Sequence, residues 1–356
     1  FSFEIFSGEE GLDSLRHILD GMNSHLEIYK SNAGSGKEGF MLREGNKQST
    51  WEERYSKIGE FEETINLFER GIKILSEDEN SLLSFQKMNE TFKEYWTNKS
   101  DDPEITPSWR LFQIIFIVSS LRSVVKNEEL EVVDVLHVMT GGGKSEAYFG
   151  LVVFTMFLER LTGKKSGVTA IVKFPLRMLS IQQLERLSSI VLYSEKIRLR
   201  YENKFTGDAF SAGFFVGQSE DFPNYFYPLK DKLKQNRSDT ISYVIPDCPL
   251  CEAKQRGKMI LKLDESSKKI VHICNLNPDH KGYIYLTDRE IYHWRPTILV
   301  STVDKWAGLA MQRRAGVLLG GKGSMCPDGH GFIPLGDCCE NITKEIECSH
   351  TGLLDD

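Results

Sequence analysis

The sequence predicts an α/β fold in which a parallel sheet carries a phosphate-binding loop, with a helical N-terminal region before it and a zinc-ribbon-like insertion within it. Three observations predict this fold class. An apolar segment at 132–138 runs into a glycine turn and a helix-forming segment. Further β-branched runs alternate with helical patterns, and a Cys-x-x-Cys pair lies within a polar stretch in the second half of the chain.

Residues 1–105 are expected to be a helical region, because apolar side chains recur there at roughly helical spacing. The stretch at 31–38 imitates a phosphate loop, but Glu38 stands where a hydroxyl is needed, so a flexible loop is predicted. The net charge of −7 argues against bulk attraction to nucleic acid. The absence of a long apolar run or signal peptide predicts a soluble, cytoplasmic protein without membrane contact.

The segment at 108–125 is predicted to be one buried helix that leads to a strand at 132–138 and then to the glycine loop. Three successive glycines allow several backbone N–H groups to face one polyphosphate at a helix N-terminus. Lys144 would then reach the β- and γ-phosphates of ATP, and the Ser145 hydroxyl would hold Mg²⁺. A glycine-rich hairpin turn is the alternative, and it leaves this Lys-Ser pair unexplained.

Gln113 is a candidate for adenine recognition, since a side-chain amide both donates and accepts hydrogen bonds, although a solvent-facing glutamine is equally unremarkable. The nucleotide-binding set predicted around the loop is Gln113, Thr140, Gly141, Gly142, Gly143, Lys144, Ser145 and Glu146.

Three later apolar runs, at 167–173, 211–217 and 298–300, are predicted to be strands of the same sheet. In open parallel sheets, ligands bind at the carboxyl ends of the strands. Arg177 and Gln182, which follow the first run, are therefore expected near the crevice that holds the phosphate loop.

Four segments occur in an order that resembles the first RecA-like lobe of superfamily 2 helicases. They are Arg110–Gln113, Thr140–Ser145, Pro175–Gln182 and Ile298–Trp306. The resemblance implies a RecA-like fold, ATP hydrolysis with Lys144 and Ser145 as catalytic residues, and movement on DNA. It also implies that the backbone of one DNA strand is contacted by Pro175, Arg177, Gln182, Thr302 and Lys305.

A narrower resemblance, over residues 108–332, is to the DISARM antiphage-defence helicases of the DrmA family. It implies a DrmB-like partner protein and a DNA substrate. No Asp-Glu-x-His strand follows position 306, and Asp264–Glu265 is predicted to be a hairpin turn. The residues that activate water for hydrolysis are therefore expected outside this stretch of chain.

All seven cysteines lie after position 247, which suits metal binding better than a disulfide framework. Cys248 and Cys251 form a knuckle, Cys274 follows two predicted strands, and His280 is the first choice as fourth ligand, ahead of His272. This is a zinc-ribbon layout, since Zn²⁺ takes two ligands from each of two turns. Buried free thiols are the alternative.

The C-terminal part offers donors for a second zinc ion, for which Cys326, His330, Cys338 and Cys348 are predicted. Cys338 and Cys339 are adjacent, so one of them is expected to be spare. Four protein ligands leave no open position for water, so both sites are expected to be structural.

The domains expected are a helical region at 1–105, a RecA-like lobe at 106–218 and 295–320, an insertion at 219–294 and a Cys/His-rich insertion at 321–356. The function predicted is an ATP-dependent DNA helicase or translocase of bacterial defence. The alternatives are a nucleotide-gated DNA-binding or scaffold module, and a kinase-like P-loop enzyme that acts on a small molecule.

Overall fold

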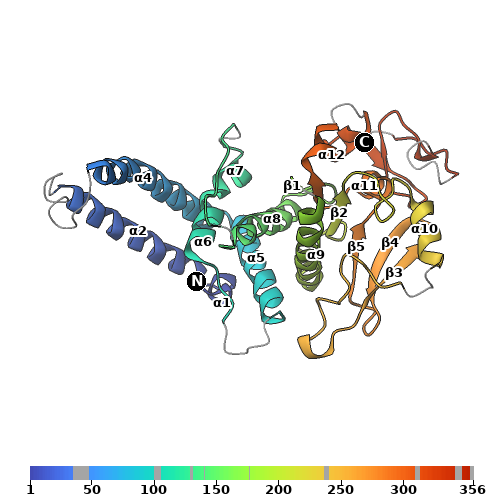
Figure 1. The fold of residues 1–356 in the computed structure, drawn as a ribbon, viewed down its shortest axis with the longest axis horizontal. Coiled ribbons are helices and arrows are strands. Elements are labelled where there is room, and N and C mark those ends of the chain that lie inside the picture. The colour runs from blue at the N-terminus through green and yellow to red at the C-terminus, as the bar shows by residue number, and fades with distance from the viewer. Residues whose placement is uncertain are drawn as a thin grey trace. The chain divides into compact units, whose positions relative to one another are not determined.

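The structure is a computed structural model. It describes residues 1–34, 48–99, 106–128, 131–139, 141–175, 177–235, 240–308, 313–340 and 347–352, without the side chains of 32–34, 48–56, 177–180 and 313–315. The chain divides into two units (Figure 1). The first is Phe1–Lys93 with Thr106–Thr155, and the second is Glu94–Ile105 with Met156–Asp356. Among the described residues, every helix is too short or too polar to cross a bilayer.

The first unit is helical, and its long helices α2 (Gly11–Gly34) and α4 (Gln48–Glu77) pack along each other as an antiparallel pair (Figure 1). Each buries apolar side chains at helical spacing, as Phe68, Ile72 and Leu75 show in α4. Gly71 lets α4 approach the Val118 backbone closely, since a Cβ at Gly71 would be 2.0 Å from the Val118 carbonyl oxygen. The remaining helices of this unit are α1 (Phe3–Ser7), α6 (Leu111–Ser119), α7 (Leu121–Lys126), and parts of α5 (Glu79–Thr97) and α8 (Lys144–Leu161).

Two predictions for this unit are wrong. The segment 108–125 is two helices, because the Ser120 hydroxyl donates to the Phe116 carbonyl at 2.8 Å and Ser120 takes a ψ of −7°. The apolar segment before the glycine loop forms no strand, and the side chains of Val133 and Val135 are 82% and 83% exposed. Its alternation predicted a strand, but a strand needs a neighbour to accept its hydrogen bonds, and the described residues of this unit provide none.

The second unit is built on a six-stranded sheet in the order β1-β6-β2-β5-β4-β3. The first four strands in that order are parallel to one another. Strand β4 is antiparallel to both of its neighbours, β5 and β3. Strands expected from sequence at 211–217 and 298–300 are present, and that expected at 167–173 begins three residues later. The bounds are β1 Ala170–Phe174, β2 Ser211–Phe215, β3 Met259–Asp264, β4 Lys269–Cys274, β5 Lys281–Tyr285 and β6 Ile298–Thr302.

The predicted β3–β4 hairpin is confirmed, and it extends the main sheet through β5 (Figure 1). The turn predicted at Asp264–Glu265 joins these two strands. The Asp264 carboxylate accepts hydrogen bonds there from the backbone N–H and hydroxyl groups of Ser266 and Ser267. Burial disfavours the Asp264 carboxylate, but these bonds prevail and lower its pKa to about 2.

Helix α9 (Arg177–Arg200) packs on one face of the sheet against β1, β6, β2 and β5. The other face carries α11 (Asp288–Trp294), whose Ile291 packs with Phe215 and Leu299 in a buried cluster that includes Cys326, Cys339 and Cys348. The smaller elements are α10 (Phe226–Gln235), η1 (Ala253–Gln255), α12 (Val303–Ala307), η3 (Arg313–Leu319) and the β7–β8 hairpin (Gly323–Met325 with Phe332–Pro334).

Candidate functional site

The loop before α8 turns at two glycines with backbone angles that favour glycine. Gly141 and Gly143 have φ values of 80° and 86°, and the Gly142 amide donates to the Met139 carbonyl at 3.0 Å. A Cβ at Gly143 would also lie 2.8 Å from Nε2 of Gln113. Helix α8 begins directly afterwards at Lys144, so the N–H groups of its first turn lie at the glycine turn. Thr140 lies outside the described residues.

The side chains around this loop bind its own carbonyl groups. The ammonium of Lys144 donates to the carbonyl oxygens of Val138 and Met139. The Gln113 amide donates to the Gly143 carbonyl at 2.7 Å, and Arg110 donates to the Gly142 carbonyl at 2.8 Å.

The hydroxyl of Ser145, in the first turn of α8, accepts a hydrogen bond from Tyr148 at 3.1 Å, and Glu146 is half-buried beside it. The described residues of the predicted nucleotide-binding set thus lie around one turn. In this arrangement a phosphate would have to draw Lys144 away from its two carbonyl groups.

The residues expected to contact nucleic acid lie partly along one edge of the sheet. Strands β1 and β6 end side by side, with Phe174 opposite Thr302, so the exposed Pro175 and the start of α12 follow at the same edge. Gln182 is exposed on α9, and the side chain of Arg177 is not described. Pro175 and Thr302 therefore end neighbouring strands at one edge.

Lys305 is held by an ion pair with Asp288, whose Oδ2 is 2.6 Å from the lysine Nζ. Both side chains are less than one fifth exposed, and burial raises the pKa of Asp288 although Lys305 offsets part of that effect. Thr302 caps α12 by accepting from the Lys305 amide at 3.4 Å. Lys173 on β1, whose Nζ lies 5.4 Å from the ring centre of Trp306, is an exposed cation at this edge that the sequence reading did not single out.

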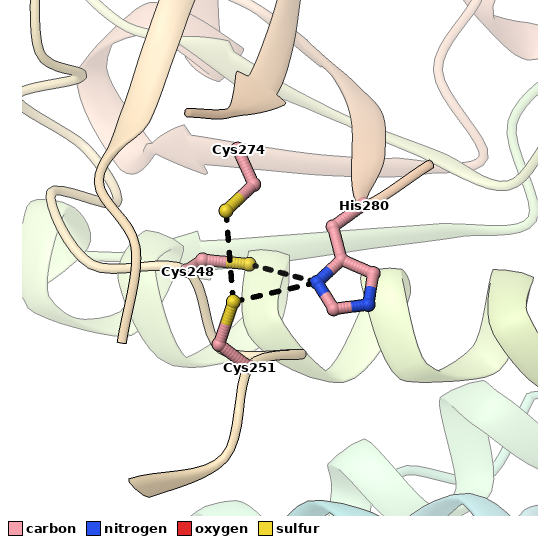
Figure 2. A group of neighbouring side chains, drawn as sticks. All are labelled: Cys248, Cys251, Cys274 and His280. Carbon is pink, nitrogen blue, oxygen red and sulfur yellow. Dashed lines mark hydrogen bonds between the residues drawn. The ribbon is translucent and has the colours of Figure 1, made fainter. Parts of the chain in front are cut away.

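Four side chains converge where β4 ends and β5 begins, as the sequence predicted (Figure 2). Nδ1 of His280 lies 3.6 Å from Sγ of Cys248 and 3.5 Å from Sγ of Cys251, and the sulfurs of Cys251 and Cys274 are 3.6 Å apart. A tetrahedral zinc ion would give edges of about 3.8 Å between sulfurs and about 3.5 Å between sulfur and nitrogen. This first Cys/His group could therefore hold a metal such as zinc.

The alternative ligand His272 is not part of this group. Its imidazole is fully buried on β4, and among the described residues neither ring nitrogen has a hydrogen-bond partner. Burial lowers the pKa of His272 to about 3. Its side chain is therefore a neutral core residue in this structure.

Residues outside the ligand set hold the knuckle in place. The Asn98 amide donates to the carbonyls of Pro249 and Cys251 at 2.9 and 2.7 Å, and the Tyr193 hydroxyl donates to that of Pro249 at 2.5 Å. Gly257 leaves room for the sulfur of Cys274, because a Cβ there would lie 2.5 Å from it. Sequence reasoning missed all three, since a distant asparagine or tyrosine carries no metal-ligand spacing.

The thiols of this group differ in acidity. Burial raises the pKa of Cys248, which disfavours its thiolate. Burial also acts on Cys274, but the backbone N–H groups of Asn277 and Leu276 outweigh it and lower its pKa. Burial lowers the pKa of His280, which keeps the imidazole neutral as a metal requires. A bound cation would displace the Cys248 proton, so binding at this group would release protons.

The second Cys/His group joins Cys326, His330, Cys339 and Cys348. Nδ1 of His330 lies 3.5 Å from Sγ of Cys326 and 3.7 Å from Sγ of Cys339, and the sulfurs of Cys326 and Cys348 are 3.7 Å apart. It has the same three-thiol, one-imidazole composition as the first group and could also hold a metal such as zinc.

Cys339 takes the place that was predicted for Cys338. The Cys339 amide donates to the His350 carbonyl at 2.9 Å, and this contact directs the buried Cys339 sulfur inward, while Cys338 pairs with Thr351. An overlapping set joins Cys326 and Cys348 with Asp328 and His350. Asp328 and His350 are exposed, so the buried thiol set is the stronger candidate.

No protein-family model matches the chain. The chain is 31% identical over 375 residues to the DISARM protein DrmA of Bacillus paralicheniformis, an alignment that covers 95% of this chain and 32% of that relative. The chain thus spans about a third of the relative's length, and the resemblance inferred from the motifs is confirmed. Over almost its full length, this chain is similar to one part of a DISARM protein DrmA.

Proposed function

We propose that this chain is the ATP-binding first motor lobe of a DNA helicase or translocase that acts in antiphage defence. The observation that carries the proposal is the turn at Gly141–Ser145, which leads directly into α8 and is bound by Gln113. In the bound state Lys144 would leave the Val138 and Met139 carbonyls to contact the phosphates, and Ser145 would hold Mg²⁺.

The sheet edge where β1 and β6 end supports a role in binding nucleic acid, because two segments that resemble helicase motifs meet there. We propose that Pro175, Arg177, Gln182, Thr302 and Lys305 contact the DNA backbone. Lys305 would then exchange its ion pair with Asp288 for a phosphate. Contacts of this kind position the strand without reading its sequence, so binding should weaken steeply with salt.

Similarity to a DISARM protein supports the defence role and a DrmB-like protein partner. Two Zn²⁺ ions, one in each Cys/His group, would rigidify the segments that supply their ligands. ATP hydrolysis would require residues beyond this stretch, because Asp264–Glu265 lies in a hairpin turn with Glu265 paired to Lys230 at 2.7 Å. A cytoplasmic location stays a prediction.

The proposal is tested by Lys144→Ala in the full-length protein, with ATP turnover measured with and without DNA. We expect DNA-stimulated turnover to fall at least about a hundredfold, because the phosphates lose their cation, while salt-sensitive DNA binding persists. Lys126→Ala, an exposed lysine of α7, is the matched control. DNA-stimulated turnover that survives in Lys144→Ala would refute the assignment.

A nucleotide-gated DNA-binding or scaffold module is the second candidate, and the placement of Asp264–Glu265 in a hairpin favours it. Such a module would bind ATP at Lys144 and change its affinity for DNA without turnover. DNA affinity measured with ATP and with a non-hydrolysable analogue separates the two. Equal effects of both nucleotides, together with no DNA-stimulated turnover in the wild type, would favour the module.

A further inference from the structure

A cavity of about 210 Å³ lies in the second unit, at the edge of the sheet opposite to the candidate nucleic-acid residues. It is lined where β2 and β6 begin, by Ser211 and Thr297, which exchange hydrogen bonds of 3.1 and 3.2 Å between backbone N–H and hydroxyl groups. Parallel strands β1, β2 and β6 present their amino ends together at this edge. The cavity is therefore separate from the edge where Phe174 and Thr302 end those strands.

Three cations line this cavity, against one carboxylate, that of Asp208. They are Arg160, Lys269 and Arg295, and among the described residues none has an ion pair with a carboxylate. Burial lowers the pKa of each. Asp264 and Glu290 also act on Lys269 from a distance, but Glu290 is fully buried and its pKa is raised to about 7. Asp208 acts on all three cations, and Glu159 and Glu195 act on Arg160, so the positive charge of the cavity wall is compensated only from a distance.

The cations are held by rings and neutral acceptors, so part of their donor capacity is unused. The Lys269 ammonium lies 4.1 Å from the ring centre of Trp294 and 4.8 Å from that of Tyr283, and it has no hydrogen-bond acceptor among the described residues. The guanidinium of Arg160 donates to the carbonyls of Lys164 and Asp208 at 2.8 and 3.2 Å. The ammonium donors of Lys269 therefore have the most unused capacity at this cavity.

Arg295 reaches the cavity from a strained position. It ends α11 with φ 42° and ψ 74°, a left-handed conformation that glycine adopts more easily. Its guanidinium stacks 3.6 Å over Phe332 and donates to the Ser166 hydroxyl at 2.9 Å. A non-glycine residue here costs on the order of 1 kcal/mol, and the contacts with Phe332 and Ser166 offset part of that strain.

We propose that this cavity binds a phosphoryl group through Arg160, Lys269 and Arg295. Arginine and lysine together match the shape and charge of a phosphate. The volume is smaller than the roughly 300 to 1,000 Å³ of sites that enclose drug-sized molecules, which limits the enclosed part to a phosphate or pyrophosphate. The rings of Trp294 and Tyr283 are covered by Lys269, so they are not free to stack on a base.

The test measures the thermal shift and the calorimetric affinity of the full-length protein with inorganic phosphate and pyrophosphate, against potassium chloride at equal ionic strength. Lys144→Ala is the parent, so that binding at the glycine loop does not contribute. A ligand that binds only the folded state raises the melting temperature with concentration. We expect Lys269→Gln and Arg295→Gly each to weaken phosphate binding about tenfold, the loss of one charge-assisted contact.

Lys262→Gln, an exposed lysine on the adjacent strand β3, is the control and should bind phosphate like the parent. Arg295→Gly loses its stack on Phe332 and Lys269→Gln its contact with Trp294, so phosphate affinity is measured for each variant below its own melting temperature in phosphate-free buffer. A deoxynucleoside 5′-monophosphate that binds more tightly than free phosphate would indicate a nucleotide source, and equal affinity would indicate the free ion. Equal phosphate affinity in the parent and all variants would overturn the proposal. A parent protein that responds to phosphate no more than to potassium chloride would also overturn it.

Discussion

Gly257→Ala should weaken zinc binding at the first Cys/His group without touching a ligand. The added Cβ would lie 2.5 Å from Sγ of Cys274 and 2.8 Å from Oδ1 of Asn275, whereas ordinary contacts begin near 3.4 Å. The sulfur would therefore have to move by about 1 Å, while ligand distances at a metal site tolerate only about 0.2 Å. Changes around a metal site typically lower its affinity 10- to 100-fold, which is about 1.4 to 2.8 kcal/mol.

The assay is competition between the protein and a chromogenic chelator, with total zinc measured by mass spectrometry. The wild type should hold two ions per chain. Gly257→Ala should release one of them at about 10- to 100-fold lower chelator concentration, while the second group keeps its ion. Gly217→Ala is the matched control, since a Cβ at Gly217 meets nothing within 4 Å. Unchanged release of both ions from Gly257→Ala would refute the reasoning.

Three further predictions concern single side chains. Cys339→Ser should reduce zinc from two ions to one per chain, whereas Cys338→Ser should keep both; the reverse pattern by metal analysis would contradict the second group. Asn98→Ala should leave the Pro249 and Cys251 carbonyls without their donor and weaken zinc binding about tenfold in the same chelator assay; unaltered affinity would exclude a positioning role. The folded-state pKa of Asp264, about 2, is below its ordinary value near 3.8, so its contribution is present above pH 4 and lost as pH falls towards 2. Because the group is partly exposed and solvent screens it, that contribution is about 1 kcal/mol or less, and Asp264→Asn should remove this part of the pH dependence in acid-denaturation curves; curves that coincide would contradict it.

The elements that the sequence predicted well are those whose interacting residues lie close together in the chain. The β3–β4 hairpin has two strands joined by a short turn, and Cys248, Cys251 and Cys274 gain their meaning from spacing alone. Strands β2 and β6 are fully buried apolar runs, which suit the centre of a parallel sheet. In each case the local sequence is enough to predict the element or the ligand.

The features that sequence could not give depend on contacts between distant segments. Val133 and Val135 have the pattern of a strand, but pairing requires a neighbour that no local pattern specifies. The choice of Cys339 over Cys338 is set by a backbone contact to His350, eleven residues later. Lys305 looks free in the sequence and is paired with Asp288 in the structure, on the preceding helix α11.

The central claim is that a nucleoside triphosphate binds at the Gly141–Ser145 turn. It is tested most directly by equilibrium binding of Mg·ATP to the full-length protein and to its Lys144→Ala variant, with Lys126→Ala as control. The account predicts saturable binding that is lost or at least about tenfold weaker only in Lys144→Ala, since the phosphates lose a charge-assisted contact. Equal affinity in all three proteins would contradict it.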